Sequence, residues 1–139
     1  MSCRLIKVDT ENLHLAWNDA VCYLENALFQ TPEYTLLDIY RLIKERALTL
    51  WMFYNDKKKT ACGAMATEII EHPRKRVLSI FLLGADDFKQ IEPLFAQVLL
   101  YAKHVKADEV ECAGRMGLEK LLSDIGFKKS YIVMNYTVN

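Results

Sequence analysis

Apolar residues in the first third of the chain recur at the three- and four-residue steps that place them on one face of a helix. This spacing predicts a first helix that Asp9 or Thr10 caps, with an apolar stripe running from Leu13 to Leu28, and Pro32 ends it. Thr35 is a residue type that caps helices, and the apolar steps after it predict a second helix. Before them, a short apolar run from Leu5 to Val8 predicts a first strand.

Beyond residue 47 the pattern changes from helical steps to extended runs. β-Branched and aromatic residues are concentrated in segments 48–54, 60–70 and 77–83, which two short polar turns separate. We therefore expect three strands in an antiparallel meander. Segment 77–83 is apolar almost throughout, so we expect both of its faces to be covered.

The segment after this meander predicts a crossover. Its helical stripe of apolar residues runs from Ile91 to Val105 with Pro93 in the first turn, and a strand from Val110 to Ala113 follows. Strands joined through a helix of this length pair in parallel, with a right-handed connection. We interpret the chain as one α/β (α+β) domain over residues 1–139, with a mixed central sheet and helices on both faces.

The C-terminal residues predict a glycine turn at 114–117, a short helix at 118–125 and a final strand. Gly126 fits the position just past a helix end, where φ is positive, and Phe127 can then return onto the helix. An apolar run from Tyr131 to Met134 predicts the last strand, on which we expect Tyr131 and Tyr136 to pack.

Composition narrows the classes of function. The 139 residues hold 18 basic and 18 acidic side chains, so no net charge attracts nucleic acid or an anionic membrane. No apolar run reaches the ~18 residues of a membrane span, and we expect a soluble protein. The four cysteines show no metal-type pairing, which favours a reducing compartment. His14, His72 and His104 are far apart in the chain and predict no metal site.

Six short motifs occur in a fixed order along the chain. They are Leu50-Trp51, Thr67-Glu68-Ile69-Ile70, the run from Pro73 to Leu78, Gly84, Gly114-Arg115-Met116-Gly117 and Gly126-Phe127. Together with the element order, they resemble the GNAT N-acetyltransferase fold, and more closely the small GNAT-like proteins encoded in tailed-phage genomes. The resemblance covers essentially the whole chain. It implies the sheet expected above and, in active members, acetyl-CoA as the cofactor.

The resemblance also indicates where acetyl-CoA chemistry is altered. Active members carry a glycine-rich loop before the crossover helix, because its backbone N–H groups bind the pyrophosphate. The corresponding segment here, residues 84–93, has one glycine and three acidic residues, Asp86, Asp87 and Glu92, with Lys89 as its only basic residue. Carboxylates at a helix start favour capping of that helix instead.

The catalytic positions of the family depart in the same way. The tyrosine that serves as general acid in many members corresponds to Leu122, and an asparagine often found near the preceding strand end corresponds roughly to Arg115. Glu68 is the candidate general base, although a glutamate at such a strand position is also typical of a solvated side chain.

The candidate cofactor-binding residues are Gly84, Ala85, Gly114 and Arg115. In GNAT folds two parallel strands separate at these ends, and we expect the gap to survive here as a shallow groove. Arg115 has two interpretations that stay open, an anion contact and a hydrogen bond that holds its own turn. The basic turns 57–59 and 74–76 are typical of soluble hairpins, with a weak contact to an anionic partner as the alternative.

These observations lead to two functional hypotheses. The first is a GNAT-like phage protein without cofactor that has a binding or structural role, with virion components or another protein as partner. It would act in the virion or in the cytoplasm of the infected bacterial host, without membrane or nucleic acid. The alternative is an active N-acetyltransferase that uses acetyl-CoA through a divergent cofactor loop to acetylate an amine.

Overall fold

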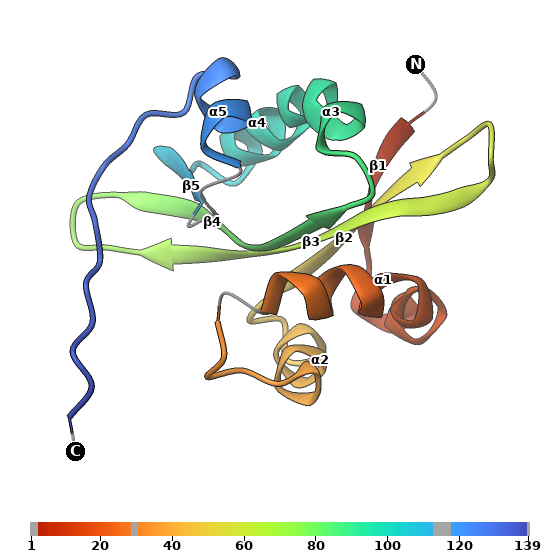
Figure 1. Ribbon diagram of the computed structural model, residues 1–139, viewed down its shortest axis with the longest axis horizontal. Coiled ribbons are helices and arrows are strands. Elements are labelled where there is room, and N and C mark those ends of the chain that lie inside the picture. Colours follow the sequence, from red (N-terminus) through yellow and green to blue (C-terminus); the bar gives the residue numbers. More distant parts are fainter. Residues whose placement is uncertain (1–2, 29–30, 113–117, 139) are drawn as a thin grey trace.

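The computed structural model describes residues 3–28, 31–112 and 118–138, and it places helices on both sides of one five-stranded sheet (Figure 1). The strands are β1 (Cys3–Val8), β2 (Thr49–Asn55), β3 (Thr60–Glu71), β4 (Arg76–Ala85) and β5 (Glu109–Cys112), and they lie in this order across the sheet. The first four pair antiparallel, whereas β5 pairs with β4 in parallel. The predicted meander and the parallel strand pair after it are confirmed.

Two helices cover one face of the sheet, α1 (Leu13–Leu28) and α2 (Leu36–Lys44), and a short 3-10 turn, η1 (Thr10–Asn12), leads into α1. The predicted cap at Thr35 is a full capping box. The Asp38 amide donates to the Thr35 hydroxyl (3.2 Å), and the Thr35 amide donates to the Asp38 carboxylate (2.8 Å). The Thr35 amide, and then the Thr35 hydroxyl (3.0 Å), donate to the Asp38 carboxylate and lower its pKa, because they stabilise its charged form.

The opposite face carries α3 (Phe88–Ile91), a 3-10 turn η2 (Glu92–Leu94), α4 (Phe95–His104) and α5 (Glu119–Asp124). The single crossover helix expected around Pro93 is wrong in this detail, since the segment is divided into three pieces. Pro93 has no amide hydrogen to give to the preceding turn, and it lies in the 3-10 turn that joins the two helices.

The apolar residues form one cluster on each face of the sheet, which makes the core three-layered. Strand β4 contributes to both clusters, with Leu82 on the side of α1 and α2 and with Leu78, Ile80 and Leu83 on the side of α4 and α5. All four side chains are at most 6% exposed. The prediction that both faces of this strand are covered is therefore confirmed.

Strand β4 bends at a β-bulge centred on Phe81. Neighbouring residues Ala66 and Thr67 of β3 oppose Leu82 and Ile80 of β4, so Phe81 is one residue in excess. The described part of β5 ends at Cys112, opposite Ile80, whereas β4 continues to Ala85. Residues 81–85 of β4 therefore have no partner strand on this side among the described residues.

The end of α5 confirms the predicted role of Gly126. Its φ is 109°, the Gly126 amide donates to the Ser123 carbonyl (3.1 Å), and the Phe127 amide donates to the Leu122 carbonyl (2.9 Å). This pair of bonds is the Schellman motif. It turns Phe127 back to an edge-to-face contact with Phe95, with ring centroids 6.4 Å apart.

The final strand expected at Tyr131–Met134 is wrong, because residues 128–138 adopt no regular structure. Tyr131 is 75% exposed and Tyr136 is 91% exposed, so the expected packing of both rings is also wrong. The tail runs past the β3–β4 hairpin toward the side that carries α2 (Figure 1). An apolar run becomes a strand only when another strand pairs with it, and no strand of the described residues pairs with this tail.

Candidate functional site

The end of strand β4 is packed against helix α1 without a side chain between them. A Cβ added to Gly84 would lie 2.5 Å from the Tyr23 carbonyl oxygen, closer than any side chain tolerates. Gly84 thus permits the close approach of α1, and Ala85 beside it is half-buried. The other two candidate cofactor residues, Gly114 and Arg115, lie outside the described residues, so the predicted groove at this edge stays a prediction.

Asp86, the residue after β4, is held by two elements. The Tyr23 hydroxyl of α1 lies 2.9 Å from the Asp86 carboxylate and 3.1 Å from the Ala61 carbonyl, and the Asp86 amide donates to the Cys62 carbonyl (2.9 Å). Burial, the hydrogen bond to Asp86 and the charge of Asp86 raise the pKa of Tyr23 to about 12. Tyr23 therefore stays protonated at neutral pH.

Asp87 caps the helix that follows. Its carboxylate accepts the Lys89 amide at 3.0 Å, and its backbone is extended, as at the start of many helices. The interpretation of these carboxylates as caps is confirmed for Asp87. Asp86 and Asp87 belong to the segment expected to correspond to the family's glycine-rich loop, and the Lys89 side chain is exposed.

A second group of polar residues crosses the sheet below the bulge. Glu68 of β3 is opposite Ser79 of β4, which is opposite Glu111 of β5. Residues opposite one another point to the same face of a sheet, and the apolar neighbours of Ser79 point to the α4 side. We call these three residues the acidic row, and it lies on the face that carries α1 and α2.

Partial burial of two carboxylates, Glu68 and Glu111, makes the acidic row a candidate functional site. Burial, and then the neighbouring charge of Glu111, raise the pKa of the Glu68 carboxyl. Ser79 is 7% exposed and has no hydrogen-bond partner among the described residues. A serine between two carboxylates is an arrangement that a cationic or hydrogen-bonding ligand would complete.

Sequence reasoning identified Glu68 but missed Ser79 and Glu111. The alternation of side chains along each strand indicates which residues share a face of the sheet. To place Ser79 and Glu111 beside Glu68, however, one must also know the register between the three strands. The connection between α1 and α2 also reaches this region, because Tyr34 packs edge to face on Phe81 with ring centroids 5.0 Å apart.

A pair of cysteines carries less chemistry. The Cys3 and Cys62 sulfurs lie 3.8 Å apart at the other end of the sheet, where burial and then the contact with Cys3 raise the pKa of the Cys62 thiol to about 12. A thiol with this pKa is a poor nucleophile. No cluster of three or more metal-binding side chains occurs in ranges 3–28, 31–112 and 118–138.

A cavity of about 500 Å³ lies between the end of β1 and the connection from α2 to β2. Lys7 and Arg46 line it together with Asp9 and Glu11, so its charges are mixed. It shares no lining residue with the acidic row or with the end of β4. Within the described part of the chain, no helix combines the length and apolarity needed to cross a bilayer.

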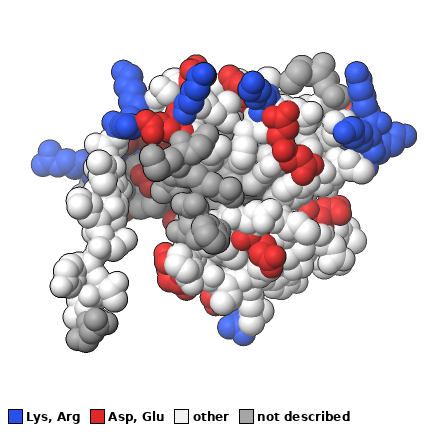
Figure 2. Space-filling model, in the orientation of Figure 1, with Lys and Arg blue, Asp and Glu red and all other residues white. Residues whose placement is uncertain are grey.

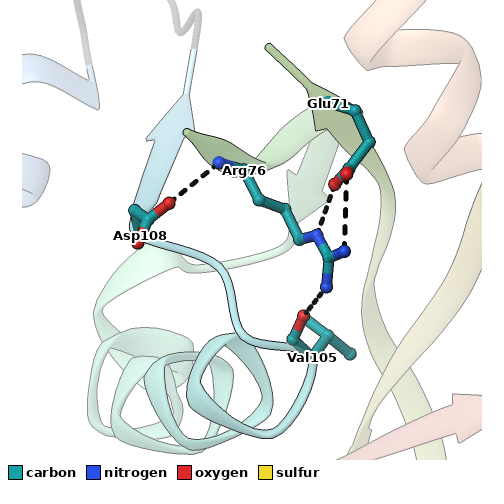
Figure 3. A network of polar contacts seen from close by, with 4 residues as sticks. All are labelled: Glu71, Arg76, Val105 and Asp108. Carbon is teal, nitrogen blue, oxygen red and sulfur yellow. Dashed lines mark hydrogen bonds and ion pairs between the residues drawn. The ribbon is translucent and has the colours of Figure 1, made fainter. Parts of the chain in front are cut away.

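The basic turn at 74–76 is part of the fold. The Arg76 guanidinium makes a two-point contact with the Glu71 carboxylate, and its Nη1 donates to the Val105 carbonyl at 2.6 Å (Figure 3). The Arg76 amide donates to Asp108 (2.9 Å), and Lys75 pairs with Glu109 (2.9 Å). Arg76 and Lys75 therefore join the β3–β4 hairpin to α4 and β5, and the alternative of an anionic partner is not needed to explain these two cations.

Comparison with known structures shows which fold this is. The chain superposes on a probable acetyltransferase with a TM-score of 0.71 and 16% identity, covering 98% of this chain and 97% of that one. An aminoglycoside acetyltransferase from an uncultured soil metagenomic sample gives 0.70 and 12%, covering 99% and 97%. A predicted acetyltransferase with acetyl-CoA from Clostridium acetobutylicum gives 0.67 and 12%, covering 96% of each chain.

These likenesses define the class of the protein as a GNAT-fold α/β domain. At 12–16% identity they show the fold alone. No protein-family profile and no curated protein sequence matches the chain. The expected GNAT fold is thus confirmed, whereas the closer resemblance to tailed-phage proteins stays a prediction.

Proposed function

We propose that this chain is a GNAT-fold binding protein whose acetyl-CoA site no longer accepts the cofactor's pyrophosphate. One observation carries the proposal: two carboxylates are fixed at the end of β4. Asp86 is held by the Tyr23 hydroxyl, and Asp87 already occupies the Lys89 amide at the start of α3. A pyrophosphate would lose this donor and meet two like charges.

The size of the electrostatic repulsion decides whether this loop tolerates or excludes a pyrophosphate. Two unit charges 4 Å apart near a protein surface repel by about 4 kcal/mol. Asp86 and Asp87, with Lys89 as the only basic residue of the loop, therefore make this position unfavourable for a pyrophosphate. Such a protein would use the surface of its α/β domain to bind a partner and would not bind the cofactor.

Calorimetric titration with acetyl-CoA and with S-acetylpantetheine, which lacks the phosphates, tests the proposal. We expect no acetyl-CoA binding by the wild type up to about 1 mM, and detectable binding by a D86N/D87N double variant. E25Q is the control, since it removes an acidic charge from the exposed side of α1, outside this loop. Micromolar acetyl-CoA binding by the wild type, with a raised melting temperature, would refute the altered site.

Acetyl transfer to an amine is the second candidate, and the acidic row favours it. Glu68 and Glu111 flank Ser79 and would attract a protonated amine, and the raised pKa of Glu68 makes that carboxylate a better base for the ammonium proton. The free amine would then attack the thioester carbonyl, and the CoA thiolate would leave and take up a proton. On the β5 side, residues 81–85 of β4 have no partner strand among the described residues, and their backbone there would be available to an extended pantetheine arm.

Release of free CoA from acetyl-CoA measures this second candidate. The amines to be tried are an aminoglycoside and glucosamine 6-phosphate, because proteins with the same fold are acetyltransferases of these compounds. If transfer occurs, we expect E68Q to lower kcat by about a hundredfold, whereas E25Q on the exposed side of α1 leaves it unchanged. No release with any amine would remove the candidate.

The resemblance to tailed-phage proteins suggests that the binding partner is a virion component. This part of the proposal rests on the sequence motifs. Mass spectrometry of purified virions from a host that expresses the protein during infection would test it. Detection of the chain at a fixed copy number would support a virion role, and its presence only in the host lysate would place its action in the infected cell.

A further inference from the structure

The cavity between the end of β1 and the connection from α2 to β2 has the size of a ligand site. Its volume of about 500 Å³ lies within the roughly 300–1,000 Å³ that small-molecule pockets occupy. The paired part of β1 and β2 ends at Val8 and Leu50, and from there one segment leads to α1 and the other comes from α2. No lining residue belongs to the acidic row or to the end of β4, so this cavity is separate from the site discussed above.

Part of the cavity wall is apolar. Ile43, Leu48 and Leu50 line it and are each at most 4% exposed, and Val8 is half-buried. We call these four residues the apolar wall. They belong to the packed cluster under α1 and α2, so the wall has a fixed shape before any ligand arrives. A ligand side chain that covers it would be stabilised by the removal of apolar surface from water.

Charged side chains of both signs line the same cavity without pairing. Asp9, Glu11 and Arg46 are exposed, and their side chains have no hydrogen-bond or ion-pair partner in the part of the chain that the structure describes. The ammonium of Lys7, the fourth charged residue, lies over the Tyr101 ring, 5.9 Å from its centroid. Opposite charges that surround a cavity without contact can be bridged by a ligand that carries both signs.

The local charges decide which ligand is attracted, because the molecule has no net charge. Figure 2 shows acidic and basic side chains interspersed over one face, without a field of one sign across that face. A ligand of a single charge would therefore be attracted by one group of the cavity and repelled by the other.

Arg46 is an unusual residue for its backbone conformation. Its φ is 66°, in the left-handed region where glycine and asparagine are preferred. Its amide donates to the Ile43 carbonyl (3.0 Å) after the end of α2, a bond that any amide at this position would make. The guanidinium is thus not needed to end the helix, whereas it can make a two-point contact with a carboxylate.

We propose that this cavity binds a small zwitterion with an apolar side chain, that is, a free amino acid or a short peptide. The ligand carboxylate lies at Arg46, its ammonium lies at Asp9 and Glu11, and its side chain covers the apolar wall. The Thr10 and Thr49 hydroxyls also line the cavity and have no hydrogen-bond partner among the described residues. They supply further hydrogen bonds to the two charged groups of the ligand.

Calorimetric titration of the full chain with leucine and its derivatives tests the proposal. Leucinamide keeps the ammonium but lacks the carboxylate, and N-acetyl-leucine keeps the carboxylate but lacks the ammonium. We expect leucine or leucyl-glycine to bind at least about tenfold more tightly than either derivative. Tighter binding of leucine would identify a free amino acid as the ligand, and tighter binding of leucyl-glycine would identify a peptide. No binding of either zwitterion at about 10 mM would overturn the proposal, as would equal binding of a singly charged derivative.

Substitution of Arg46 separates binding from folding. Arg46→Gly removes the guanidinium and suits the positive φ, so we expect a melting temperature no lower than that of the wild type. Its affinity for the zwitterion that the wild type binds should fall at least about tenfold. Arg41→Gln, on the exposed side of α2 and outside the cavity, is the matched control and should bind as the wild type does.

The carboxylates are tested in the same way. The double variant D9N/E11Q should bind the zwitterion at least about tenfold more weakly than the wild type, because the ammonium loses both of its partners. Affinity that neither this double variant nor Arg46→Gly changes would overturn the proposal.

Discussion

At the scale of single residues, the backbone of Gly126 determines where α5 ends. A Cβ at this position would meet no atom within 4 Å, so space does not require the glycine. The backbone angle φ of 109° does require a glycine, because residues with a Cβ disfavour this conformation. The value lies beyond the usual left-handed helical angle, which makes glycine more necessary here than in an ordinary cap.

We therefore expect Gly126→Val to lower the free energy of unfolding by roughly 1–3 kcal/mol. Gly126→Asn should cost less, since asparagine tolerates positive φ better than other residues with a side chain. Urea denaturation of the three proteins measures the difference. Equal midpoints for the wild type and the valine variant would contradict the strain argument.

The Tyr23–Asp86 bond makes a pH-dependent contribution to stability. The pKa of Tyr23 is about 12 in the folded state, whereas tyrosine in the unfolded chain titrates at ~10. The folded state therefore holds the Tyr23 proton more tightly. The contribution is fully present below pH ~10 and is lost as the pH rises through about 12. Unfolding in urea at pH 9 and at pH 11.5 should show a larger loss in the wild type than in Tyr23→Phe. The same loss in both proteins would show that other groups cause it.

At the scale of elements, one arginine connects three segments. Arg76 joins the hairpin after β3 to the end of α4 and the start of β5. We expect Arg76→Ala to speed hydrogen exchange at the Ala107 and Asp108 amides, which lie in the connection to β5. Arg76→Lys should restore only part of the protection, because one ammonium cannot make the two-point contact and reach Val105.

Arg74 provides the matched control for this experiment. It lies two residues away in the same turn and has no partner among the described residues. Arg74→Ala should leave both amides at wild-type exchange rates. Equal effects of the two alanine variants would indicate a general charge effect of the turn, in place of the contacts of Arg76.

The elements also show what the sequence can and cannot predict. Helix α2 and strands β2 to β4 follow from local patterns, because each pattern has its partner nearby in the chain. The prediction of a final strand was wrong for the opposite reason. Residues 131–134 have the composition of a strand, but a strand also needs a neighbouring strand to pair with, and composition does not specify that neighbour. The acidic row was found only at Glu68, since Ser79 and Glu111 join it through the register of the sheet.

At the scale of the whole molecule, two apolar clusters share a single sheet. Trp17 belongs to the cluster under α1 and α2, whereas Trp51 belongs to the cluster under α4 and α5. Strand β4 contributes buried residues to both, so neither layer can lose its packing while the other keeps its full contacts. The domain should therefore unfold as one cooperative unit.

Single-tryptophan variants test this cooperativity. Trp17→Phe leaves fluorescence that reports the α4 layer, and Trp51→Phe leaves fluorescence that reports the α1 layer. In each variant we expect the fluorescence and circular dichroism transitions in urea to coincide. Trp51→Phe should have the lower midpoint, because it also leaves the Thr67 hydroxyl without its indole donor. Separate transitions would show that the layers unfold independently.

The bulge at Phe81 has a consequence for the length of the chain. Phe81 and Leu82 both face the α1 layer, so the excess residue is absorbed there and the residues on either side keep their proper faces. Deletion of Phe81 would shorten β4 by one position and still send Ile80, Leu82 and Leu83 to alternating sides. Relatives without this residue would therefore align with a one-residue gap here and carry a straighter strand. An insertion or deletion elsewhere in β4 would exchange the faces of every residue beyond it.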